Sequence, residues 1–118
     1  DPRLAAAAQG LADHMARTGQ FSHQADGRTP AQRVEAQQYQ WTFVAENIAF
    51  RSDAGISPDD TARLLMEQWL TSPGHRQNIL SPQATQFGAA TAQSTNGAVY
   101  GVQVFAAPAA SPSPQASP

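Results

Sequence analysis

Apolar residues recur at helical spacing in the first twenty positions, "DPRLAAAAQGLADHMARTGQ". The apolar face of this predicted helix consists of Leu4, Ala8, Leu11 and Met15. Asp1 and Pro2 suit the first turn, where the helix dipole favours an acid and proline costs no hydrogen bond. Gly19 is a typical stop. The pattern therefore predicts an amphipathic helix that ends near residue 19.

Two further helices are predicted from their starting residues. In "TPAQRVEAQQ" (29–38), Thr29 caps a short helix and Pro30 begins it. In "SPDDTARLLMEQWLTS" (57–72), Ser57 is the cap of the clearest helix in the chain, which we expect to end at Pro73-Gly74. Its predicted apolar stripe consists of Ala62, Leu65, Met66 and Trp69.

The remaining apolar stretches predict extended chain. "YQWTFVAENIAF" (39–50) is aromatic and β-branched, which favours a strand or an ordered loop. Near the end, "FGAATAQST" and "AVYGVQVFA" flank Asn96-Gly97, a strong hairpin signal in which both turn residues are expected at positive φ. The second of these strands is apolar on both faces and should be covered on both sides. Helices and a small sheet together predict an α+β fold of layered type.

Composition narrows the function classes. The chain of 118 residues is one domain in length, and its net charge of −2 gives no reason to expect a nucleic-acid or anionic-membrane partner. No apolar run is long enough to span a bilayer, and the absence of cysteine excludes disulfides and thiolate metal sites. We expect a folded domain at 1–106 and a disordered Pro/Ser/Ala-rich tail at 107–118.

Candidate chemistry centres on His23, Glu46 and His75, the last in "SPGHRQNIL". Glu46 lies in the apolar stretch "AENIA", so if buried it needs an imidazole, a guanidinium or backbone N–H groups as partners. Two histidines and a carboxylate could bind a divalent metal with an open position, or form a polar cluster without metal. No HExxH zinc-protease motif occurs. His14 is expected at the edge of the first helix's apolar face, as a surface or boundary residue, and Glu67 is expected in solvent.

Five stretches occur in a characteristic order: "FSHQADGRTPAQRV", "AENIA", "WLTSPGHRQNIL", "FGAA" and "YGVQVF". In this combination, from about residue 1 to 105, the chain resembles the CAP superfamily of cysteine-rich secretory (SCP-like), antigen 5 and pathogenesis-related 1 proteins, in its bacterial extracellular branch. The resemblance implies a three-layer α-β-α sandwich with a small antiparallel sheet, in a secreted or cell-envelope protein. It also implies a cleft of His23, Glu46 and His75, in which His23 and His75 bind zinc or another divalent metal.

The chain departs from the family pattern at two points. The family's second cleft glutamate corresponds to Ser72, which leaves the site less negative and predicts weaker metal binding. Family members also have a further N-terminal helix, whose absence predicts a trimmed or processed chain with apolar surface left uncovered.

The resemblance implies ligand binding or interaction with cell-surface components. We therefore expect a monomeric, non-enzymatic binding module that takes a metal and a small-molecule, lipid-like or cell-envelope ligand. Two alternatives stay open. One is a metal-dependent hydrolase or protease with Glu46 as general base on a metal-bound water, although the sequence shows no oxyanion-stabilising device. The other is a structural cell-envelope module in which the histidines bind nothing.

Overall fold

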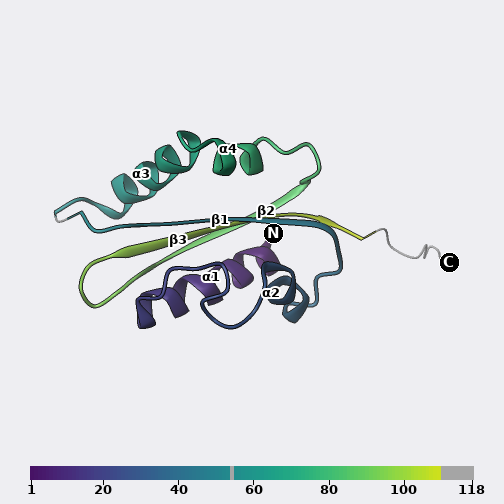
Figure 1. Cartoon of the computed structure of the whole chain (residues 1–118), viewed down its shortest axis with the longest axis horizontal. Helices are drawn as coiled ribbons and strands as arrows, with labels where there is room; N and C mark the ends of the chain where they lie inside the picture. The colour runs from purple at the N-terminus through teal and green to yellow at the C-terminus, as the bar shows by residue number, and fades with distance from the viewer. Residues whose placement is uncertain (54, 110–118) are drawn as a thin grey trace.

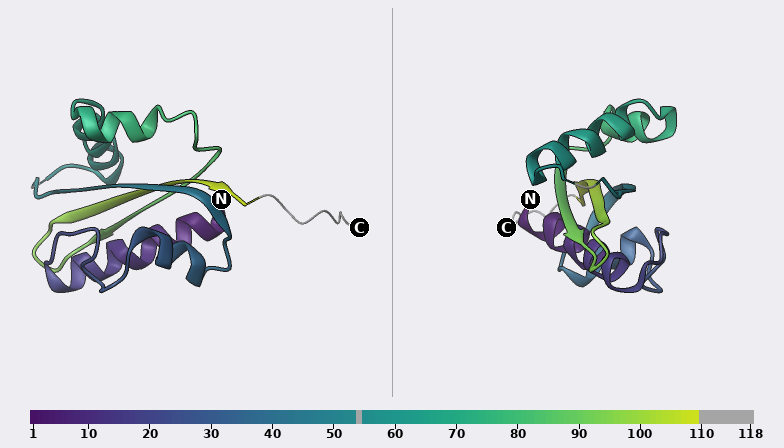
Figure 2. Two further views of the ribbon diagram at one scale, coloured as in Figure 1. Left: turned by 45° about the vertical axis from the view of Figure 1, so that its right-hand side comes forward. Right: turned by 90° about the vertical axis from the view of Figure 1, so that its left-hand side faces the viewer.

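Two layers of helices enclose a three-stranded sheet in the computed structural model, which describes residues 1–53 and 55–109. The elements are α1 (Pro2–Thr18), α2 (Pro30–Ala36), β1 (Trp41–Arg51), α3 (Pro58–Leu70), α4 (Pro73–Ile79), β2 (Gln86–Gln93) and β3 (Val99–Pro108). The antiparallel strands lie in the order β1-β3-β2. The pair α1 and α2 covers one face, and α3 and α4 cover the other (Figures 1 and 2). The predicted α-β-α sandwich is confirmed.

The predicted start and stop residues set the helix boundaries. Asp1 caps α1 by accepting hydrogen bonds from the N–H groups of Arg3 and Leu4, and the helix ends at Gly19 in a left-handed conformation. Thr29 forms a reciprocal capping box with Gln32 at the start of α2. These side chains satisfy N–H groups that a helix start otherwise leaves unpaired.

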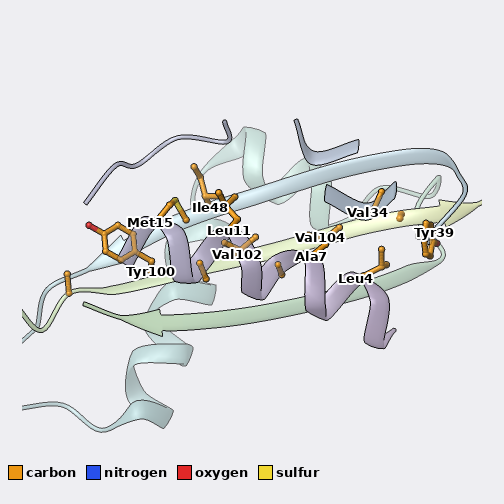
Figure 3. Close-up of a cluster of buried hydrophobic side chains, with 14 residues drawn as sticks. Leu4, Ala7, Leu11, Met15, Val34, Tyr39, Ile48, Tyr100, Val102 and Val104 are labelled. Atoms are coloured by element: carbon orange, nitrogen blue, oxygen red, sulfur yellow. The ribbon is translucent and has the colours of Figure 1, made fainter. Parts of the chain in front are cut away.

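The central strand β3 is buried on both faces, as its apolar character predicted. Tyr100, Val102 and Val104 belong to the larger core cluster, which packs against α1 (Figure 3). Phe105 is also buried, although its side chain belongs to the other face of the alternating strand. Burial on both faces fits the central place of β3 in the sheet, between β1 and β2 and with helices on either side.

The hairpin between β2 and β3 is of a different type from the one predicted. Only Gly97 has a positive φ, whereas Asn96 does not. The N–H of Gly97 donates to the Ser94 carbonyl, and the N–H of Ser94 donates to the Ala98 carbonyl. This is a three-residue loop with a glycine bulge, which needs the left-handed conformation at one position instead of two.

The apolar stripe of α3 also differs from the prediction. Thr61, Leu65 and Trp69 are buried, whereas Met66 is 37% exposed. The Pro73-Gly74 step does end α3, but it also begins α4, a helix that the sequence analysis did not predict. An apolar groove of about 300 Å³ remains between α3 and β2, lined in part by Met66 and Phe87.

The C-terminal boundary lies slightly beyond the predicted one. Strand β3 continues to Pro108, and the N–H of Ala109 donates to the Gln40 carbonyl at 2.8 Å. The rest of the predicted tail, residues 110–118, lies outside the described residues. Within the described ranges, no helix is long and apolar enough to cross a membrane.

Close packing of α1 on β2 depends on Gly88. A Cβ atom at this position would overlap backbone atoms of Leu4 and Ala5 in α1. Backbone atoms of a packed helix cannot move aside as a flexible side chain can, so the site requires a residue without a side chain.

We predict that Gly88→Ala lowers the free energy of unfolding by about 3 kcal/mol or more, because α1 must shift away from the sheet. The matched control is Gly10→Ala on the exposed side of α1, where an added Cβ meets nothing within 4 Å. That change should raise stability by up to about 1 kcal/mol. Urea denaturation measures both, and equal midpoints for Gly88→Ala and the parent would contradict the packing.

Candidate functional site

One open cleft brings together the two histidines singled out in the sequence. It has a volume of about 630 Å³ and is lined by Phe21, Ser22, His23, Gln24, Ile48, Gln68 and His75. His23 comes from the loop between α1 and α2, whereas His75 comes from α4 in the opposite layer. Ile48 belongs to β1, the edge strand between these layers. The cleft is therefore built where both layers meet at one edge of the sheet.

Glu46 does not line the cleft but is buried beside it. Its side chain is 1% exposed, and both of its carboxylate oxygens accept hydrogen bonds from Nη2 of Arg33 at 2.9 Å. Nδ1 of His23 lies 2.8 Å from Oε1. A buried carboxylate needs charged or hydrogen-bonding partners to offset its lost hydration. The prediction that Glu46 requires an imidazole or a guanidinium is confirmed, and it has both.

Arg33 ties the loop that carries His23 to the sheet. Besides Glu46, its guanidinium donates to Oδ1 of Asp26 and to the carbonyl of Arg28, both at 2.8 Å, and to the carbonyl of His23 at 2.6 Å. Arg33 itself is 2% exposed. The planar guanidinium has five donors, which allows one side chain to hold a carboxylate and a loop together.

Asn47 anchors the segment that carries His75 on the other face of the sheet. Its Nδ2 donates to the carbonyl of His75 and to Oε1 of Gln103, both at 3.0 Å. Its Oδ1 accepts a hydrogen bond from Nδ2 of Asn78 at 2.9 Å. Successive residues of a strand point to opposite faces. Glu46 and Asn47 therefore hold the segments that carry His23 and His75, respectively.

Both imidazoles are held through Nδ1. A carboxylate paired with a guanidinium can only accept a hydrogen bond, so Nδ1 of His23 donates to Glu46 and leaves Nε2 with its lone pair when the ring is neutral. Nδ1 of His75 lies 2.9 Å from the hydroxyl of Ser72, which can donate or accept. Among the described residues, neither Nε2 atom makes a hydrogen bond.

The remaining candidates take the places expected of them. His14 is half-buried on α1, near Arg17 at 3.3 Å, and is not among the residues that line the cleft. Glu67 is exposed and pairs with Arg63 at 2.9 Å, so its predicted position in solvent is confirmed.

Sequence reasoning missed Arg33 and Asn47, the two side chains that position the site. For Asn47, the signal was available in the strand pattern, because alternation places it on the face opposite to Glu46. For Arg33, the sequence allowed only a general expectation. A buried Glu46 needs a partner such as a guanidinium, but nothing in the sequence pattern indicated which arginine supplies it.

Loss of Arg33 should destabilise the protein strongly. We predict that Arg33→Met lowers the free energy of unfolding by about 3–5 kcal/mol, because it leaves Glu46 buried without its guanidinium. The control is Arg63→Met, which removes ion pairs to Asp60 and Glu67 whose side chains are more than half exposed. That change should leave the urea midpoint unchanged. Equal midpoints for both variants would contradict the importance of the buried pair.

Comparison with known proteins places this geometry in a family. The family described as "CAP: Cysteine-rich secretory protein family" matches residues 1–105. Among solved structures, an outer surface protein from Borrelia burgdorferi is similar, with a TM-score of 0.77 and 21% identity over 92% of this chain and 76% of that chain. At this identity the likeness shows a shared fold alone. No curated protein gives a significant match. The family match covers almost the whole described domain, and the chain belongs to the CAP family of cysteine-rich secretory proteins.

Proposed function

We propose that this domain is a non-enzymatic binding module whose cleft takes a divalent metal ion between Nε2 of His23 and Nε2 of His75. One observation carries the proposal. Two imidazoles from opposite layers line a single open cleft, and the Nδ1 atom of each is already engaged. Hydrogen bonds to the second ring nitrogen are the usual support of a metal-binding histidine, because they fix the ring and its tautomer.

The donor set suits a weak site for zinc or a similar ion. Imidazole nitrogen is a common zinc ligand, but a zinc site usually has three or four protein ligands. Within residues 1–53 and 55–109, no three His, Cys, Asp or Glu side chains are close enough to hold one ion. Two imidazoles would therefore share the ion with water or with atoms of a bound ligand. Ser72, in place of a glutamate, adds a hydroxyl near His75 and no negative charge.

The same geometry disfavours the hydrolase alternative. A general base must lie within hydrogen-bond reach of the water that it activates. Both oxygens of Glu46 are occupied by Arg33, one of them also by His23, and the side chain is 1% exposed. Glu46 is better suited to orient His23 than to accept a proton from the cleft. The third alternative, a structural envelope module, differs by predicting that the cleft binds no metal.

We also propose that the protein is secreted or exposed at the cell envelope, as a monomer. The family description names secretory proteins, and the similar structure is that of an outer surface protein. A cysteine-free chain needs no oxidising compartment to fold. A small-molecule, lipid-like or envelope ligand would then meet the cleft from outside the cell.

The proposed metal site predicts that both cleft histidines are needed to bind zinc. Calorimetric titration of zinc into metal-stripped protein should show one site, and His23→Ala or His75→Ala should weaken it at least tenfold. Loss of an outer-shell partner already costs about tenfold to a hundredfold, so loss of a ligand should cost at least as much. His14→Ala is the matched control and should bind zinc as the parent does. Equal zinc affinity in all four proteins would refute the metal site.

The proposed metal site also predicts that zinc affinity depends on the residue at position 72. We expect Ser72→Glu to raise zinc affinity about tenfold, or about 1.4 kcal/mol, because a carboxylate that accepts a hydrogen bond from Nδ1–H of His75 orients the ring and makes Nε2 a stronger metal ligand. Ser52→Glu adds the same charge at an exposed residue that neither lines the cleft nor bonds to His75, and it should leave affinity unchanged. If Ser52→Glu and Ser72→Glu change affinity equally, general charge would explain the effect and the bond to His75 would not.

A further inference from the structure

A row of three aromatic rings in contact runs from the core to the cleft. Tyr100 is buried, and Phe50 stacks on it with ring centroids 5.4 Å apart and an interplanar angle of 24°. Phe21 meets Phe50 edge to face at 4.9 Å. Phe21 and Phe50 are 45% and 43% exposed, and Phe21 lines the cleft two residues before His23. A partly exposed aromatic ring, supported by Phe50, therefore lies beside the imidazoles.

Apart from Phe21, Ile48 and the imidazoles, the residues that line the cleft are polar and uncharged. Ser22, Gln24 and Gln68 supply a hydroxyl and two amides, and no Asp, Glu, Lys or Arg lines the cleft. Oε1 of Gln68 accepts a hydrogen bond from Arg51 at 3.3 Å, which leaves its NH₂ group as a donor. The cleft therefore combines one aromatic face with several neutral donors and acceptors, a set that fixes the orientation of a neutral polar ligand.

We propose that the ligand of this cleft is a carbohydrate, with one pyranose ring stacked on Phe21 and its hydroxyl groups bonded to Gln24 and Gln68. A pyranose presents a flat C–H face that packs on an aromatic ring and a rim of hydroxyls that need neutral partners. This inference rests on the proposed binding role of the cleft and names its ligand class.

A lipid chain fits the cleft less well. An acyl chain gains its affinity from burial of its methylene groups in an apolar enclosure. Here the lining surface is mostly apolar, but the cleft is open, so an acyl chain lying in it would stay partly in water. A sugar needs one apolar face and an open polar rim, which is the arrangement observed.

The test is a titration of the folded protein, with and without zinc, with chitotetraose, the tetramer of N-acetylglucosamine, followed by ¹H–¹⁵N NMR. All ring substituents of this sugar are equatorial, so both faces of each ring present C–H groups. We expect saturable shifts in residues 21–24, Ile48, Gln68 and His75. Phe21→Ala should weaken sugar binding at least tenfold, and Phe21→Trp should restore it.

The matched control is Phe87→Ala, which removes a phenylalanine that is 43% exposed, close to the 45% of Phe21, but does not line the cleft. It should leave sugar binding unchanged. Absence of shifts in the cleft, equal losses in the Phe21 and Phe87 variants, or shifts caused by myristate and not by chitotetraose would overturn the carbohydrate proposal. If the sugar binds but zinc does not, the carbohydrate proposal stands and the metal proposal falls.

Discussion

Beneath the cleft, the carboxylate of Glu46 meets the guanidinium of Arg33 where both side chains are almost completely withdrawn from water. Each charge is tolerated there because the other offsets its lost hydration, and neither can be removed alone without a large penalty. From this pair, hydrogen bonds extend to the ring and the carbonyl of His23. The neighbouring Asn47 holds the carbonyl of His75 from the other face. One dipeptide of β1 thus positions both sides of the site.

The location of β1 at the edge of the sheet makes this arrangement possible. Because β3 lies on only one side of β1, segments from both helical layers can approach each other around the free edge. Opposite faces of a strand ordinarily keep their side chains apart. Here the two anchored histidines come from separate layers yet line one open cleft. A rigid support with partly exposed imidazoles is suited to binding, because the geometry is preorganised before a ligand arrives.

Features that depend on neighbouring residues could be predicted from the sequence, whereas contacts between distant segments could not. Capping residues such as Thr29 act within a few positions, so the helix starts could be predicted. The burial of β3 followed from its composition. In contrast, residues 23, 46 and 75 are far apart, and only the family resemblance suggested that they meet. Which arginine pairs with Glu46 depends on how the layers pack, and so does the position of α4. No local sequence pattern indicates either of them.

Glu46 orients His23 so that Nε2 is available in the cleft. Long-range ¹H–¹⁵N correlation spectra of the imidazoles, recorded with and without zinc, report this orientation. We expect the neutral form of His23 to carry its proton at Nδ1, with zinc shifting the Nε2 resonances of His23 and His75 while Nδ1–H of His23 persists. A neutral His23 protonated at Nε2, or a zinc response confined to His14, would contradict it.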